Sequence, residues 1–190
     1  TAGAGTSAVT IAGGAINDIL IGSTFNDVIR GGAGNDIIDN SAGNDTVTGG
    51  PGSDVLDVTT GNDRAIYLTN LDGYDTIAGF TATDSIALTT AGFAGAAAAG
   101  TDAVLGSAAF FSQTASSGAN FVVDTEANLV ANFNSASANR FFIQTNANAG
   151  RGILANTLIY DGDGNFTTTG DQNFIASGLG AVAATSFVFI

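Results

Sequence analysis

The chain has 190 residues, a net charge of −13 and 45% hydrophobic residues, so it is acidic but apolar enough to build a core. It contains no cysteine and no histidine, which excludes disulfides, thiolate metal sites and histidine-based catalysis. The negative charge disfavours nucleic acids and anionic membranes as partners, and no apolar run of about 18 residues predicts a membrane span.

Residues 13–66 repeat with a period of nine. The six units read GGAINDILI, GSTFNDVIR, GGAGNDIID, NSAGNDTVT, GGPGSDVLD and VTTGNDRAI. The residues two positions after each aspartate are Leu20, Ile29, Ile38, Val47, Leu56 and the weaker Ala65. Each unit therefore predicts a tight turn and a very short strand with one inward side chain. Because no unit can bury that side chain alone, the units are expected to stack as a solenoid.

The repeated aspartates carry the candidate chemistry. They are Asp18, Asp27, Asp36, Asp45, Asp54 and Asp63. Stacking places these carboxylates in columns, where they repel one another unless a cation lies between them. Carboxylates and turn carbonyls are oxygen ligands, which suit Ca²⁺ far better than zinc or copper. Ordinary solvated turns are the alternative, and six aspartates in strict register disfavour it.

Two units, GGAGNDIID and GGPGSDVLD, match the pattern G-G-x-G-x-D-x-U-x, so the segment resembles the RTX calcium-binding nonapeptide repeats. The resemblance implies an all-β protein. It would have a parallel β-roll (a β-helix or solenoid) over residues 5–87 and a β-rich C-terminal cap over residues 88–190. In that family, units two apart stack and share one ion. About four to five Ca²⁺ ions are therefore expected as cofactors.

The same resemblance implies the ligands of each ion, namely two carbonyls and one aspartate from each of two stacked units. The first expected site comprises Gly14, Ile16, Asp18, Gly31, Ala33 and Asp36. The site on the opposite side comprises Ser23, Phe25, Asp27, Asn40, Ala42 and Asp45. The third comprises Gly32, Gly34, Asp36, Gly49, Pro51 and Asp54, and the fourth comprises Ser41, Gly43, Asp45, Val58, Thr60 and Asp63.

The units depart from the family pattern at several glycine positions. Ile16 and Phe25 stand where the family has glycine in the first two units. Residues 40–41 and 58–59 replace the leading glycine pair in the fourth and sixth units. Weaker or partly filled calcium sites are therefore expected at these positions.

Residues 67–88 are interpreted as degenerate closing turns. Asp72 keeps the nine-residue step, which leaves a fifth site between Asp54 and Asp72 open. Asp75 and Asp84 form a second pair in a frame shifted by three residues. Sequence spacing does not decide between the two frames.

The rest of the chain predicts short strands after an Ala/Gly/Ser/Thr-rich stretch to which we assign no chemistry. The strands read FVVDT, NLVANF, NRFFIQT, NTLIYDGDGNF, QNFIASG and TSFVFI, and their turn signals favour antiparallel hairpins. Residues 75–88, 140–143 and 158–176 resemble the region that follows RTX arrays in type I-secreted proteins. Residues 184–190 resemble the uncleaved C-terminal secretion signal of those proteins, which is compatible with a last core strand.

No catalytic constellation is present, and the chain is not expected to be an enzyme. The resemblance implies the C-terminal calcium-binding module of a secreted, extracellular protein that folds on calcium after passing a type I exporter. Composition favours a surface-layer or adhesin-type structural protein, with self-assembly or a cell-surface glycan as further partners. The alternative is the secretion and stability tail of an exported protease, lipase or epimerase. A carbohydrate-binding module is disfavoured, because the net charge of −13 would repel anionic glycans.

Overall fold

The computed structural model describes residues 7–69, 71–89, 121–124, 141–144, 157–161, 172–179 and 187–189. Within these residues all regular secondary structure is β-strand, which confirms the all-β prediction. The strands of the roll are β1 (Thr10–Ala12), β2 (Ile19–Ile21), β3 (Val28–Arg30), β4 (Ile37–Asp39), β5 (Thr46–Thr48), β6 (Val55–Asp57), β7 (Arg64–Tyr67), β8 (Asp75–Ala78) and β9 (Ser85–Leu88). The later strands are β10 (Phe121–Asp124), β11 (Phe141–Gln144), β12 (Thr157–Asp161), β13 (Gln172–Ser177) and β14 (Phe187–Phe189).

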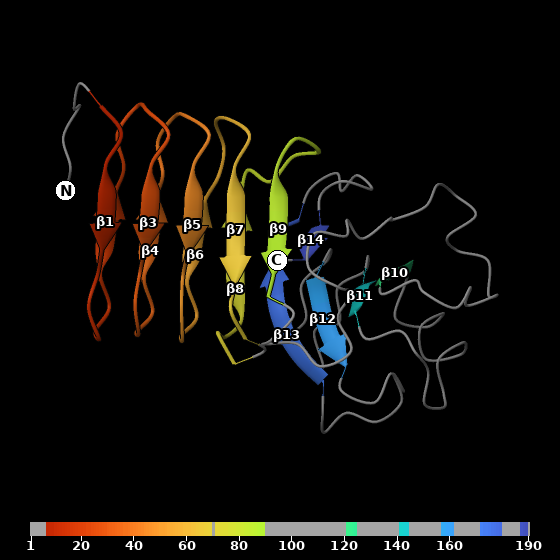
Figure 1. Ribbon diagram of the computed structural model, residues 1–190. Helices are drawn as coiled ribbons and strands as arrows, with labels where there is room; N and C mark the ends of the chain where they lie inside the picture. The colour runs from red at the N-terminus through yellow and green to blue at the C-terminus, as the bar shows by residue number, and fades with distance from the viewer. Residues whose placement is uncertain are drawn as a thin grey trace.

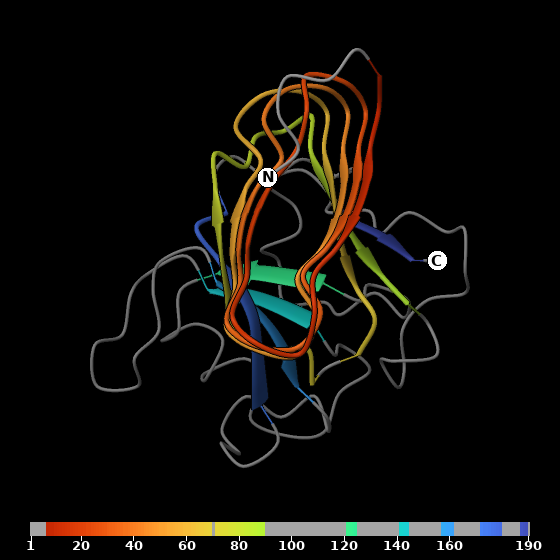
Figure 2. The ribbon, with the colours of Figure 1, turned by 90° about the vertical axis from the view of Figure 1, so that its left-hand side faces the viewer.

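Consecutive strands of the roll lie in opposite sheets. One sheet has the order β1-β3-β5-β7-β9, the other contains β2-β4-β6-β8, and all of these pairs are parallel. The chain therefore winds as a flattened solenoid whose turns superpose when seen along the axis (Figure 2). This arrangement confirms the predicted parallel β-roll.

The stacking distance along the chain is 18 residues for most of the roll. Ile37 pairs with Ile19 and Val55 pairs with Ile37 in register. At the last turn the spacing becomes 21 residues, because Val55 pairs with Thr76. The three extra residues lie in the turn between β7 and β8, so the strands keep their register across the insertion.

The core lies between the two sheets and is built from the predicted inward positions. All six of them are buried, at 8% exposed or less. Ile77 and Ile86 continue the two rows beyond the repeat. Strand side chains alternate between faces, so the neighbouring Ile37 and Val55 are exposed at 49% and 41%. Stacking therefore buries one apolar row per sheet.

In the third and fifth units, turns of the roll stack too closely for a side chain at the second position, whereas the second, fourth and sixth units have Ser23, Ser41 and Thr59 there. Gly32 and Gly50 have φ of +109° and +103°, in the region that favours glycine. A Cβ at Gly32 would lie 2.0 Å from the Gly14 carbonyl oxygen, and one at Gly50 would lie 2.0 Å from that of Gly32. Glycine is therefore required twice over, by its backbone angle and by the close approach of the next turn.

The cap strands extend both sheets of the roll (Figure 1). β13 pairs with β8, and β14 pairs with β9, in both cases parallel. The antiparallel hairpin prediction is correct for β11–β12 and β12–β13, and wrong for β13–β14, which pair with β8 and β9 instead of with each other. β10 and β11 pair in parallel. The predicted strand at residues 128–133 lies outside the described residues.

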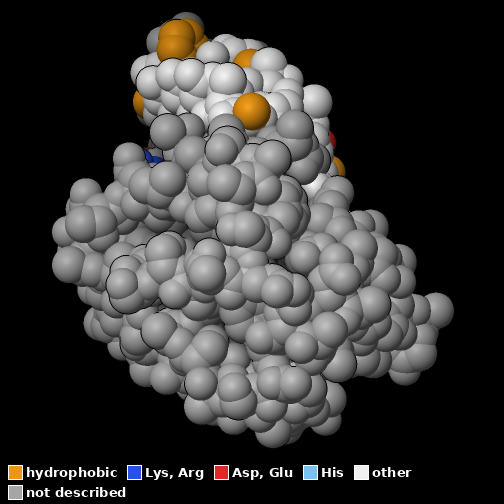
Figure 3. All heavy atoms as spheres, turned by 90° about the vertical axis from the view of Figure 1, so that its right-hand side faces the viewer, with side chains coloured by type: hydrophobic (Ala, Val, Ile, Leu, Met, Phe, Trp, Pro, Cys, Tyr) orange, Lys and Arg blue, Asp and Glu red, His pale blue; other side chains and the backbone are white. Residues whose placement is uncertain are grey.

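Among the described residues no helix is long and apolar enough to span a membrane. Seen from the side of β9 and β14, the described surface in view is mostly uncharged, with small acidic and basic spots at its margin (Figure 3). Most aspartates of the repeat are buried.

Candidate metal centre

Eight aspartates stand at the start of successive strands and stack in two columns on opposite sides of the roll. Column 1 contains Asp18, Asp36, Asp54 and Asp75, and column 2 contains Asp27, Asp45, Asp63 and Asp84. Within each column the Oδ1 atom accepts a hydrogen bond from the backbone N–H of the aspartate one turn earlier, at 2.7–2.9 Å. One oxygen of each stacked carboxylate is thus used to hold adjacent turns together.

The second carboxylate oxygen is different in the interior of the columns. The Oδ2 atoms that are buried and accept no hydrogen bond from the described residues are those of Asp36, Asp45, Asp54, Asp63 and Asp75. All five side chains are at most 2% exposed. A buried carboxylate oxygen without a partner is costly, so native proteins pair such atoms. The interior of each column therefore presents negatively charged oxygens that fit a cation.

Three aspartates at the ends of the columns, Asp18, Asp27 and Asp84, differ because their Oδ2 atoms accept hydrogen bonds within their own turns. Asp18 Oδ2 accepts from the Gly14 N–H at 2.7 Å, and Asp84 Oδ2 accepts from the Thr81 N–H at 2.7 Å. Asp27 accepts from both the N–H and the hydroxyl of Ser23, at 2.5 and 2.8 Å. The fit for a cation is therefore better between interior turns than at the ends.

The electrostatics of the interior point the same way. Burial raises the pKa of Asp45 and of Asp54 to about 6, partly offset by the backbone hydrogen bond that each accepts, and neighbouring aspartates raise it further. Burial, with repulsion from Asp54, raises the pKa of Asp75 to about 8. A divalent cation would remove this penalty by balancing the charge of two carboxylates.

The donor chemistry restricts which cation fits. No three acidic side chains among the described residues converge on one point, so each site has two carboxylates and needs backbone carbonyls to complete it. With neither histidine nor cysteine in the sequence, every available ligand is an oxygen. Calcium takes six to eight oxygen ligands in flexible geometry, including backbone carbonyls. The residues present fit calcium.

The predicted carbonyl ligands lie in the turns that flank the columns. In column 1 the carbonyl oxygens of Gly14, Gly49 and Pro51 each accept one backbone hydrogen bond from an adjacent turn, at 2.9–3.0 Å. A carbonyl oxygen has two lone pairs, so each can still contact a cation. The four predicted ligand sets remain predictions, and the pairing of their aspartates agrees with the stacking of the turns.

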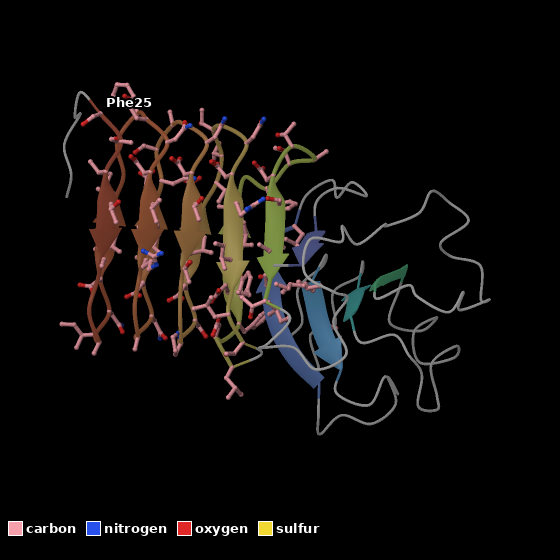
Figure 4. All side chains as sticks on the ribbon, viewed as in Figure 1. Phe25 is labelled. Carbon is pink, nitrogen blue, oxygen red and sulfur yellow. The ribbon has the colours of Figure 1, made fainter. Side chains whose placement is uncertain are left out.

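The residues that replace glycine in the first two units leave the columns unobstructed. Ile16 is 73% exposed and Phe25 is 42% exposed. The side chain of Phe25 extends outward from the outer end of its turn (Figure 4). Only the backbone carbonyls of these two residues were predicted as ligands, so their side chains do not compete for that role.

The frame after residue 66 is resolved by the structure. Asp54 stacks with Asp75, whose Oδ1 accepts from the Asp54 N–H at 2.9 Å, so the fifth site envisaged between Asp54 and Asp72 has the wrong partner. Asp72 instead accepts from the N–H groups of Leu68 and Thr69 in its own turn. Asp75 was not among the predicted ligands, although the sequence Asp-Thr-Ile after Gly73 and Tyr74 resembles the Asp-x-apolar pattern of the repeat.

A comparison with protein families matches this region. The sequence model of the RTX calcium-binding nonapeptide repeat, in four copies, matches residues 12–47 and 41–65. Residues 12–65 are RTX calcium-binding repeats. The match lies within the part of the roll that carries Asp18 to Asp63, and the RTX roll is a calcium-binding structural module rather than a catalytic one. No curated protein matches the chain.

Proposed function

We propose that the RTX roll folds when calcium enters the two aspartate columns outside the cell, after export of the unfolded chain by a type I exporter. The observation that carries this proposal is the set of five buried Oδ2 atoms without hydrogen-bond partners. Without calcium these carboxylates oppose stacking, and with calcium the binding free energy becomes folding free energy. Extracellular calcium modules work at dissociation constants of roughly 10⁻⁴–10⁻³ M, well above cytosolic calcium.

Circular dichroism of the whole chain tests this proposal. In EDTA the spectrum should be largely that of a disordered chain, and millimolar calcium should induce a β-sheet signal. Equal magnesium should not, because Mg²⁺ demands small octahedral sites and loses its water reluctantly. A chain with a full β-sheet signal in EDTA would refute the coupling between calcium and folding.

For the parent protein we propose an extracellular structural role of the surface-layer or adhesin type. The sequence contains no lysine and no cysteine and is rich in Thr, Ala, Gly and Asn. Bound calcium would make a β-rich surface structure rigid. Surface display is the test: immunolabelling of intact producing cells should detect the chain in calcium, and EDTA washing should release it. Detection only in the free culture medium would favour the tail of a soluble exported enzyme.

A further inference from the structure

The first position of the nine-residue unit faces the aspartate column. In the first, third and fifth units, which carry aspartates of column 1, this position is glycine. A Cβ at Gly31 would lie 2.2 Å from Asp36 Oδ2, and a Cβ at Gly49 would lie 2.2 Å from Asp54 Oδ2. On the backbone of the third and fifth units, a side chain at this position would therefore meet the carboxylates, in the region that would hold the ion. In column 2 the position is Gly22, Asn40 or Val58, and Val58 packs in the hydrophobic core.

Asn40 occupies this position in column 2. Its side chain is 1% exposed, and neither its Oδ1 nor its Nδ2 atom has a hydrogen-bond partner among the described residues. It begins the turn that ends at Asp45, the aspartate whose backbone N–H donates to Asp63 Oδ1 in column 2. The Oδ2 atoms of Asp45 and Asp63 are likewise buried and unpaired. The turn that leads into column 2 thus contains a buried amide with both ends unpaired, and the column itself contains two such carboxylates.

A neutral amide cannot balance two buried carboxylates, whereas a divalent cation can balance both and also accept the amide oxygen as a ligand. Asparagine side-chain carbonyls are ordinary calcium ligands. The backbone around Asn40 is also less tightly stacked than its counterpart in column 1. The Ala42 N–H to Ser23 carbonyl distance is 3.4 Å, against 2.9 Å for the Ala33 N–H to the Gly14 carbonyl. Column 2 thus combines a side-chain oxygen with a looser turn.

We propose that the side-chain Oδ1 of Asn40 is a ligand of a calcium ion held between Asp45 and Asp63, added to the backbone carbonyls of that site. This inference rests on the proposed calcium binding of the roll. It makes the two columns chemically different, because column 1 has glycine at the equivalent positions. A further ligand raises the coordination number, which favours calcium over the octahedral Mg²⁺ at this site.

Calorimetric titration of the whole chain with calcium tests the ligand. Asn40→Ala removes the amide, and it should weaken one class of ions by about 10–100-fold or more, since the loss of even an outer partner of a metal ligand costs that much. Asn62→Ala is the matched control, because Asn62 is exposed in the next turn of the same column, and it should leave the titration unchanged. Unchanged or tighter binding in Asn40→Ala would show that the amide merely fills the column and would overturn the inference.

A second measurement does not depend on the variant folding. In the ¹⁵N-labelled wild-type chain, calcium saturation should place the side-chain amide signal of Asn40 apart from those of the exposed asparagines. An Asn40 signal that matches those of exposed asparagines in the calcium-loaded chain overturns the ligand role. A wild-type chain that binds no calcium defeats the proposed function itself, whereas normal binding with Asn40→Ala unaffected defeats only this inference.

Discussion

At the scale of single residues, the two carboxylate oxygens of each interior aspartate have different environments. Oδ1 accepts the backbone N–H of the preceding turn, and Oδ2 is buried without a hydrogen-bond partner among the described residues. Asp36 is the clearest case, since it belongs to two predicted sites, while Asp18 at the end of the column has its Oδ2 bonded to Gly14. The carboxylates of one column are therefore expected to contribute unequally to calcium binding.

Asp36→Asn should consequently reduce calcium binding more than Asp18→Asn. The amide keeps the shape of the side chain but loses the charge that two ions would share. We expect the Asp36 variant to lose high-affinity binding of up to two ions and the Asp18 variant of one at most, measured by calorimetric titration. Equal losses would contradict the pairing of units two apart.

The raised carboxyl pKa values predict how the calcium-free chain responds to pH. The folded chain holds protons on Asp45 and Asp54 up to about pH 6 and on Asp75 up to about pH 8, whereas unfolded aspartates release them near pH 4. The stabilising effect is therefore complete below about pH 4 and is lost as the pH rises through 6 and then 8. In metal-free buffer the β-sheet signal should be greater at pH 5 than at pH 8.6. A calcium-free signal that grows with pH would contradict this sign.

At the scale of the element, each rung is a three- or four-residue strand that owes its stability to the rungs on either side. The turns approach so closely that the second glycine of a unit tolerates no Cβ in the interior of the roll. Gly14, in the first unit, is the exception, because the nearest atom to its added Cβ is Asp18 Oδ2 at 3.7 Å. Gly14, Gly32 and Gly50 therefore differ in tolerance because of their place in the stack.

Gly50→Ala should destabilise the calcium-loaded roll strongly. Its φ of +103° alone implies a strain of about 1–3 kcal/mol, and contact with the Gly32 carbonyl adds to it. Gly14→Ala, at the same position of the unit but without a positive φ, should change stability by less than about 1 kcal/mol. Thermal unfolding in saturating calcium measures both, and similar melting temperatures for the two variants would contradict the close stacking.

At the scale of the whole molecule, the roll is closed at one end by strands from far along the chain. β14 continues the sheet of β9, and β13 continues the sheet of β8. Edge strands expose unpaired backbone groups, so these additions cover the last rung of the roll. The segment that resembles a secretion signal thus contains a strand of the folded protein, which agrees with an address that is read before folding.

A chain ending at residue 182 lacks β14 and separates these two roles. It should keep the calcium-induced β-sheet signal, because β1 to β9 and their aspartates are intact, while its melting temperature falls modestly. In the producing cell the truncated chain should stay inside, as expected if the exporter reads the last residues. Circular dichroism and fractionation of culture and cells measure the two effects. Efficient export would show that the address lies elsewhere, within residues 156–180.

The sequence by itself determined that the units stack and which six residues point inward, and its resemblance to RTX repeats implied the roll and the pairing of aspartates two units apart. A strict nine-residue period is a local signal, because each unit encodes the same turn and strand and stacking follows from their need for a shared core. The period also indicated calcium, since oxygen ligands in columns admit few other ions.

Only the tertiary structure decided where the period is broken. Asp75, rather than Asp72, continues column 1, because the three inserted residues are absorbed in a turn and strand register, not residue count, selects the partner. The burial of the Asn40 side chain depends on which way the first position of a unit faces, and spacing does not reveal that direction. The parallel pairing of β14 with β9 joins residues about a hundred positions apart, a contact for which the local pattern carries no signal.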